Sequence, residues 1–193
     1  MKELEDKIRT EGEVYPGNIL KVGSFLNHQV DVDFLMRMGA EIARLYQSDS
    51  VTKILTIEAS GIAIAVAAAS YLHVPLVFAK KGKSKNVSND VFATDIYSFT
   101  HGNVNSVFVS REVLHPGDRI LIVDDFLADG NALEGLLRII AQANATCVGA
   151  AIAIEKGFQG GGDRLRAQGL RVESMAIIDA MSDHGVTFRT QNH

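Results

Sequence analysis

Several features that would place the chain in a specialised class are missing from the sequence. It has a single cysteine, Cys147, which rules out an internal disulfide. The apolar surroundings of this residue, TCVGAAIAI, indicate a small buried side chain in a reducing compartment rather than a nucleophile. The start of the chain, MKELEDKIRTEGEV, has no apolar signal segment, and no apolar run of about 18 residues follows. We therefore expect a cytoplasmic protein with no membrane partner.

Basic residues are not in excess either. The formal net charge is −4, whereas general nucleic-acid binding requires a basic face that displaces counterions, so we expect no nucleic-acid partner. The six histidines are scattered, and no metal-binding cluster emerges from their spacing. Hydrophobic residues at 47% and charged residues at 22% are typical of a globular protein. A length of 193 residues predicts one domain, 1–193.

Short apolar strands alternate with helical segments along most of the chain. The apolar patterns predict strands at 53–58, 74–79, 120–123, 147–155 and 171–178, and helices at 2–11, 32–47, 62–72, 133–140 and 162–168. Such alternation predicts an α/β fold, with a central mostly parallel sheet flanked by helices. Sheets of this kind bind ligands at the carboxyl ends of their strands.

Two segments depart from this pattern. The residues around Ile19–Val30 have no clean period and predict an irregular flap or short strands. Further on, the basic run Lys80–Lys85 leads into the polar residues 86–90, and VFATDIYSF with VNSVFVS predicts a β-ribbon around a turn at 101–103. A lysine-rich run is usually a solvated face. Beside an anion site it can instead close over a polyphosphate as a mobile flap and exclude water.

The stretch RILIVDDFLADGNALEGLL, residues 119–137, brings together three chemical features. A buried strand ends at two carboxylates, Asp124 and Asp125. A turn of small residues follows, in which Gly130 lets the backbone turn inward, and then a helix begins. Unpaired amides at the start of a helix favour an anion such as phosphate. Acceptors for a diol beside donors for a phosphate match a ribose 5-phosphate better than a nucleoside triphosphate.

A second turn has the same position relative to its strand. The residues Glu58, Ala59, Ser60 and Gly61 follow the strand at 53–58 and open the next helix. Their amides would form another anion site at the same sheet edge. Without the paired aspartates, an ordinary strand-to-helix turn would be the preferred interpretation.

The segment DDFLADGNA resembles the phosphoribosyl-pyrophosphate (PRPP) signature of the type I phosphoribosyltransferases, and looks most like the branch of that family that acts on xanthine. The resemblance covers nearly the whole chain, because LKVGSFLNH, EASG, DDFLADGNA and IEK occur in family order. It implies the type I phosphoribosyltransferase fold, with a small N-terminal hood at about 12–30 and a flexible loop at about 80–98. The implied reaction transfers the 5-phosphoribosyl group of PRPP to xanthine.

The resemblance also assigns roles to particular residues. The catalytic pair would be Asp124 and Asp125. The residues implied to bind PRPP are Ala128, Asp129, Gly130, Asn131, Ala132, Glu58, Ala59, Ser60, Gly61 and Lys81. Those implied to bind the base are Leu20, Asn27, Lys156 and Phe126. Mg²⁺ would arrive with PRPP rather than in a protein cage, and the enzyme would be a homodimer.

The segment departs from the commoner family pattern at three positions. Ala128 and Ala132 stand where a Thr or Ser hydroxyl often helps to hold the phosphate, so backbone amides must carry more of that contact. Asp129 places a carboxylate beside the expected phosphate. We expect its side chain to turn outward.

Two alternatives remain open at this point. A sibling enzyme could act on guanine, hypoxanthine or another base. A PRPP-sensing purine regulator would share the fold and the motif without turnover. Such a regulator would need a DNA-binding segment before the first core strand, where the residues are already assigned to a helix and the hood.

Overall fold

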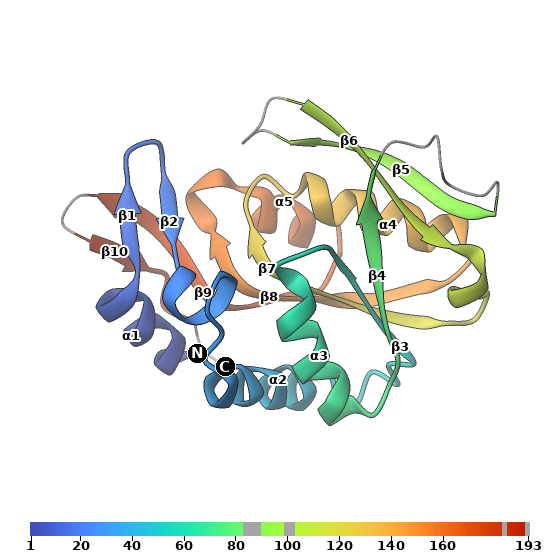
Figure 1. The fold of residues 1–193 in the computed structure, drawn as a ribbon, viewed down its shortest axis with the longest axis horizontal. Coiled ribbons are helices and arrows are strands. Elements are labelled where there is room, and N and C mark those ends of the chain that lie inside the picture. Colours follow the sequence, from blue (N-terminus) through green and yellow to red (C-terminus); the bar gives the residue numbers. More distant parts are fainter. Residues whose placement is uncertain (83–89, 99–102, 183–184, 192–193) are drawn as a thin grey trace.

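Helices and strands alternate along the structure, a computed structural model that describes residues 1–82, 90–98, 103–182 and 185–191 (Figure 1). The α-helices are α1 (Lys2–Glu11), α2 (Val32–Tyr46), α3 (Gly61–Leu72), α4 (Asn131–Gln142) and α5 (Gly161–Ala167). The strands are β1 (Glu13–Tyr15), β2 (Ile19–Lys21), β3 (Lys53–Ile57), β4 (Leu76–Lys81), β5 (Val91–Ser98), β6 (Asn103–Ser110), β7 (Arg119–Leu127), β8 (Thr146–Lys156), β9 (Val172–Ser182) and β10 (Gly185–Phe188). None of these helices is long and apolar enough to cross a membrane.

The main sheet of the described chain has eight strands in the order β10-β9-β8-β7-β3-β4-β6-β5. The pairs from β9 through β8, β7 and β3 to β4 are parallel, and the outer pairs are antiparallel. The chain leaves β3 toward β4 on one side and later returns through β7 on the other. A switch of direction of this kind opens a crevice at the carboxyl ends of the two central strands, where doubly wound sheets bind ligands.

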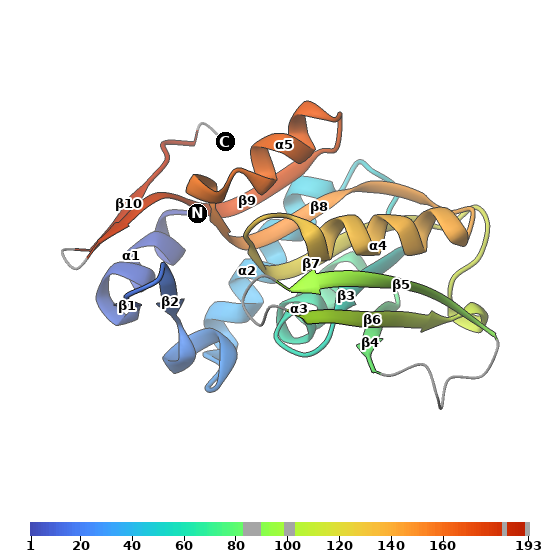
Figure 2. The ribbon, with the colours of Figure 1, turned by 90° about the horizontal axis from the view of Figure 1, so that it is seen from above.

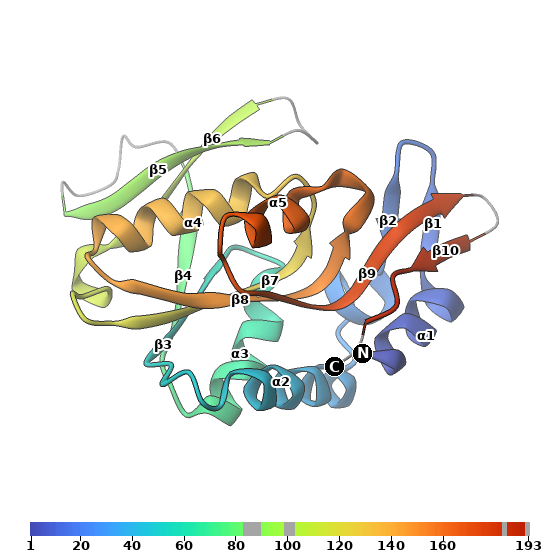
Figure 3. The same ribbon diagram turned by 180° about the vertical axis from the view of Figure 1, so that it is seen from behind.

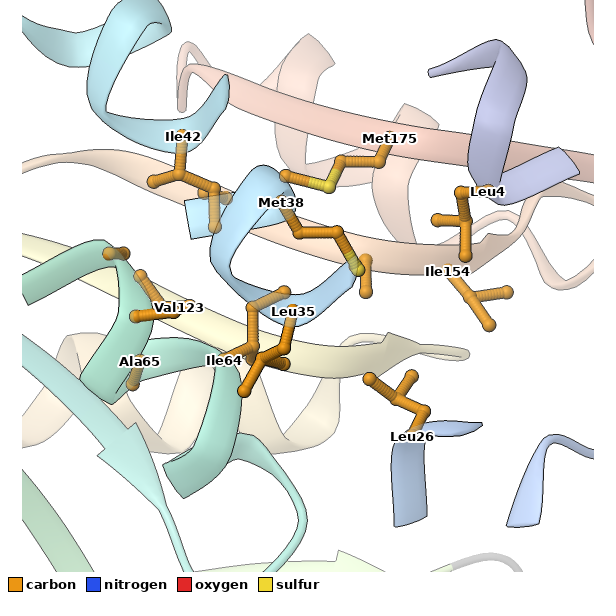
Figure 4. Packing of buried hydrophobic residues seen from close by; sticks show 14 of the residues in the cluster. Leu4, Leu26, Leu35, Met38, Ile42, Ile64, Ala65, Val123, Ile154 and Met175 are labelled. Carbon is orange, nitrogen blue, oxygen red and sulfur yellow. The ribbon is translucent and has the colours of Figure 1, made fainter. Parts of the chain in front are cut away.

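Alternate residues of β7 pack on opposite faces of the sheet. Leu121 and Val123 belong to the core formed with α2 and α3, whereas Ile120 and Ile122 belong to the core formed with α4. Figures 2 and 3 show these two helical layers, and Figure 4 shows Val123 among the side chains of the α2 and α3 side. A strand buried on both faces requires a continuous apolar run, which explains why the predicted strands proved reliable here.

The predicted helices are confirmed within one or two residues at most of their ends. Asp31 caps α2, because its side chain accepts a hydrogen bond of 3.1 Å from the backbone N–H of Phe34. The residues 12–30 contain the antiparallel pair β1-β2 and a π-helical turn at Gly23–Asn27, which agrees with the prediction of short irregular elements. We refer to these residues as the hood.

Three features of the sheet differ from the prediction. The strand expected to end before Asp124 continues to Leu127, because the long neighbour β8 extends the hydrogen-bonded ladder as far as the Leu127 and Glu155 pair. The strand β10, a short edge strand antiparallel to β9, was not predicted from the sequence. The ribbon β5-β6 is confirmed. Its strand β5, however, occupies residues 91–98, which fall within the flexible loop expected at 80–98. The remainder of that loop at 83–89, and most of the turn at 101–103, lie outside the described residues.

A buried ion pair connects the end of β8 with α5. Glu155 has no exposed side-chain surface, and its two carboxylate oxygens accept hydrogen bonds of 2.9 and 2.6 Å from the Arg166 guanidinium. The Ser174 hydroxyl donates a further hydrogen bond of 2.5 Å to Glu155. Because Glu155 is fully buried, removing Arg166 would leave its carboxylate without the cation that pairs with it.

We expect Arg166→Met to lower the free energy of unfolding by about 3–5 kcal/mol, because Glu155 would remain buried without its cation. Chemical denaturation measures this change. Arg44→Met is the control, since Arg44 forms an exposed pair with Glu41 and its removal should leave stability unchanged. Equal losses in the two variants would show that the buried pair has no special role.

Candidate active site

A cavity of about 300 Å³ lies at the carboxyl edge of the sheet. The ends of β3, β4, β7 and β8 form its floor, and the ribbon β5-β6 contributes a wall. The lining residues are Ile57, Glu58, Ser60, Lys81, Ile96, Tyr97, Asn105, Val107, Asp124, Asp125, Ala128, Asp129, Asn131, Ala132, Lys156 and Gln159. The crevice predicted from the strand order is therefore present, and both polar and apolar side chains line it.

The paired aspartates lie on the floor of this cavity, near the end of β7. Asp124 is 8% exposed and Asp125 is 6% exposed, and the backbone N–H of Asp125 donates a 3.0 Å hydrogen bond to Oδ1 of Asp124. Burial raises the pKa of Asp124 well above its usual range, and the neighbouring charge of Asp125 raises it further. Hydrogen bonds donated by a ligand to this pair would replace those lost with water and would favour the charged form of Asp124.

The turn between β3 and α3 approaches the pair closely. A Cβ on Gly61 would lie 2.6 Å from Oδ1 of Asp124 and 2.3 Å from Oγ1 of Thr56, so only glycine allows α3 to begin here. The Glu58 side chain accepts a 2.6 Å hydrogen bond from the backbone N–H of Lys81, which joins this turn to the end of β4. The Ser60 hydroxyl makes no capping bond to α3.

The small-residue turn after β7 leads directly into α4. Gly130 adopts a left-handed conformation with φ of 90°, as its place in the motif predicted. Asp129 does not turn outward, and that expectation was wrong. Its two carboxylate oxygens accept hydrogen bonds from the backbone N–H of Asn131 (3.1 Å) and from Nδ2 of Asn131 (3.0 Å). The unpaired amide at the start of a helix attracts the nearest acceptor, which here is the carboxylate two residues earlier.

Lys156 ends β8 and reaches the cavity from the opposite side. Its Nζ donates a 2.9 Å hydrogen bond to the backbone carbonyl of Asn18 in the hood, and it lies 5.8 Å from the centre of the Phe126 ring. Burial lowers the pKa of Lys156 below its usual range. A half-buried ammonium group whose hydrogen bond goes to a neutral carbonyl is well suited to receive an electron-rich oxygen of a ligand.

Not all the residues assigned from the sequence line this cavity. Ala59 and Gly61 lie outside its lining, and Gly130 and Phe126 line a smaller neighbouring cavity of about 90 Å³. In the hood, Leu20 is buried in the core and Asn27 is exposed at the end of the π-helical turn. Lys156 joins the hood to the cavity through Asn18, so the hood lies beside the site.

The ribbon wall and Gln159 were missed by the sequence analysis. The wall consists of Ile96, Tyr97, Asn105 and Val107. The alternating pattern of β5 and β6 predicted a ribbon but not its position above the strand ends. Gln159 lies in the turn Gly157–Gln159, close behind Lys156. The only available signal was a polar side chain following the strand that carries Lys156.

Comparisons with known proteins identify the class to which this fold and site belong. Residues 31–167 match the family model described as the phosphoribosyl transferase domain, and the chain belongs to this family. Adenine phosphoribosyltransferase from Trypanosoma brucei superposes with a TM-score of 0.78 at 17% identity, covering 98% of this chain and 85% of its own. The adenine enzyme from Rhodothermus marinus gives 0.75 at 21%, covering 92% and 100%. These structural likenesses show the type I phosphoribosyltransferase fold.

The relatives that match by sequence are more similar to the chain and share one more specific name. The xanthine phosphoribosyltransferase of Alkaliphilus metalliredigens is 53% identical over 98% of this chain and 94% of its own length. The xanthine phosphoribosyltransferase of Clostridioides difficile is 50% identical over 98% and 100%. The chain thus matches these two proteins along nearly the full length of each.

We expect Asp124→Asn to stabilise the protein, because the wild-type carboxylate loses water when it is buried. The raised pKa means that the folded state releases its proton at a higher pH than the unfolded state. The stability of the wild type relative to the variant should therefore fall by up to about 1.4 kcal/mol per pH unit above pH ~4, until the raised pKa is passed. Denaturation of both proteins from pH 4 to pH 8 measures the difference. A constant difference across this range would contradict the assignment.

Proposed function

We propose that the protein is a xanthine phosphoribosyltransferase. It transfers the 5-phosphoribosyl group of PRPP to xanthine, giving xanthosine 5′-monophosphate and pyrophosphate in purine salvage. The observation that carries this proposal is the cavity itself. It places a carboxylate pair and two helix-opening turns on one side and a half-buried lysine on the other. Relatives with about 50% identity and this name support the choice of base.

The sugar-phosphate half of the site is proposed to lie along the ends of β3 and β7. Asp124 and Asp125 accept the ribose hydroxyls, and the amides of residues 128–132 hold the 5-phosphate. The turn Glu58–Gly61 and Lys81 hold the pyrophosphate. Support comes from the dipole of α4, which favours an anion beside its first residues, and from Gly61, which brings the start of α3 next to Asp124.

The base half is proposed to lie between Lys156 and the hood. Lys156 donates to an exocyclic oxygen of the purine, Phe126 contacts the ring, and Leu20 and Asn27 belong to the cover. The hydrogen bond from Lys156 to Asn18 supports this arrangement, because the ammonium group already donates to an oxygen on the hood side. Since an ammonium group can only donate, a ligand amine in that place would leave it unpaired.

Mg²⁺ is proposed to bind together with PRPP. The donor set fits, because Asp124 and Asp125 offer carboxylate oxygens, the ligand type that Mg²⁺ prefers. The described residues contain no group of three potential metal-binding side chains, so the remaining ligands would come from PRPP and water. When bound, Mg²⁺ neutralises charge on the leaving pyrophosphate.

Catalysis in this site depends on positioning rather than on a nucleophilic side chain. The carboxylate pair fixes the ribose, and its negative charge stabilises the positive charge that develops as the bond at the anomeric carbon breaks. The backbone amides of the two turns hold the phosphate groups in place. The ribbon β5-β6 forms a wall that keeps water from the anomeric carbon. Water that reached this carbon would react with it in place of the base.

A homodimer and a cytoplasmic location are further parts of the proposal. The family resemblance supports both, and the composition agrees with the second. Several large apolar side chains on α3 and β4 are exposed, namely Val66, Tyr71 and Phe78. Light scattering coupled to size-exclusion chromatography measures the oligomeric state.

Incubation of the purified protein with PRPP, Mg²⁺ and one purine base at a time tests the proposed function. Xanthine should give the highest kcat/KM. Guanine and hypoxanthine keep the oxygen expected to face Lys156 and should be weaker substrates. Adenine carries an amine there, and each buried polar group left unpaired costs about 1–3 kcal/mol, so turnover should be very poor. A preference for adenine would overturn the proposal.

We expect the double substitution Asp124→Asn with Asp125→Asn to remove most turnover while the fold stays intact. The amides keep the shape of the carboxylates but lose the charge that holds the ribose. Steady-state kinetics and circular dichroism measure the two effects. Unchanged turnover in a folded double variant would show that the pair does not hold the sugar.

We expect Asn27→Ala to narrow the preference for xanthine over guanine by about tenfold, equivalent to one lost hydrogen bond of ~1.4 kcal/mol. The two bases differ at the purine 2-position, and the amide can both donate and accept there. The KM for PRPP should hardly change. A variant in which PRPP binding weakens as much as xanthine use would show that the hood does not recognise the base.

A further inference from the structure

The carboxylate of Asp129 occupies donors in the turn assigned above to the 5-phosphate. Oδ1 accepts from the backbone N–H of Asn131, and Oδ2 accepts from Nδ2 of the same residue. We propose that Asp129 is an internal competitor of the sugar phosphate, whose side chain must rotate away before the phosphate can bind the donors of Asn131. The inference rests on the proposed function, because it takes the turn at 128–132 as the phosphate site.

All three donor hydrogens of Asn131 are engaged. Its backbone N–H has one hydrogen, which points to Asp129. Its side-chain amide has two, of which one points to Asp129 and the other to the backbone carbonyl of Tyr97 at 3.3 Å. Carboxylate and phosphate oxygens are acceptors of the same kind, so a phosphate can bind these donors only in place of Asp129.

The backbone of the turn has little freedom to move instead. Nη2 of Arg164 donates a 2.6 Å hydrogen bond to the carbonyl of Asp129, and the same guanidinium pairs with Glu134 in the first turn of α4. From α5, Gly161 packs so closely that a Cβ there would lie 2.4 Å from the carbonyl oxygen of Ala128. Because α5 fixes the backbone, rotation of the Asp129 side chain is the available way to free Asn131.

The turn has few side-chain donors, so the occupation of Asn131 by Asp129 affects phosphate binding. Ala128 and Ala132 have no hydroxyl to offer, so the side chain of Asn131 supplies the polar hydrogens that supplement the backbone amides. Asp129 lines the same cavity as Asp124 and Asp125, and its charge repels a phosphate that approaches them. Asp129 therefore weakens sugar-phosphate binding through both its charge and its hydrogen bonds.

Calorimetric titration with ribose 5-phosphate tests the inference without turnover. Asp129→Ala removes the competitor and should bind this probe about tenfold more tightly than the wild type, a change equivalent to ~1.4 kcal/mol. Asp129→Asn should be intermediate, because its oxygen can still accept from the backbone N–H of Asn131 while its amide can no longer accept from Nδ2. Glu112→Gln, at an exposed position outside the lining of the cavity, is the control for the loss of one negative charge and should bind like the wild type.

Affinities in both Asp129 variants equal to or weaker than that of the wild type would overturn the inference. If Asp129→Ala has a lowered Tm, Asp129→Asn decides alone, because it keeps the hydrogen bond that shapes the turn. Kinetics separate this result from the proposed function. If the wild type uses xanthine but the Asp129 variants bind ribose 5-phosphate no more tightly than the wild type, only the competitor role of Asp129 is overturned. If the wild type does not use xanthine but the affinities for ribose 5-phosphate rank as expected, the competitor role of Asp129 is supported and the xanthine assignment is overturned.

Discussion

The structure depends on one constraint, the parallel alignment of β3 and β7 in the middle of the sheet. Their pairing, which joins Leu55 with Ile122, brings both strands to the same edge before the chain turns into α3 and α4. Because the two strands are buried on both faces, the polar residues that follow them are forced together in the crevice. Burial of Asp124 disfavours its charge, and the apolar cores on the two faces of the sheet must compensate for this.

Several polar groups of the site are satisfied by the chain itself. Lys156 bonds to a hood carbonyl, the carboxylate of Asp129 bonds to Asn131, and Glu58 bonds to the amide of Lys81. Substrate binding in the proposed reaction is thus largely an exchange of partners. Exchanges of this kind keep the net gain per hydrogen bond small, so specificity comes from the polar groups that a wrong ligand would leave unpaired.

Helix α5 supports both halves of the proposed site. Through Arg166 it holds Glu155, the residue before Lys156, and through Arg164 it holds the turn that carries Asp129. The base side and the phosphate side therefore share one short helix as their support. A change in the packing of α5 would be felt at both, although neither arginine lines the main cavity.

The sequence by itself predicted the helices, the strands of the main sheet other than β10, and the candidate residues of the site, because buried strands need apolar runs and helix-opening turns need glycine and small residues. The motif around Asp124 and the turn before Gly61 needed only local pattern. Tertiary structure alone decided that Asp129 folds back onto Asn131, that Lys156 reaches Asn18, and that the ribbon forms a wall. These contacts depend on which acceptor or surface lies nearest in space, and for Lys156 and the ribbon the partners are far apart in the chain.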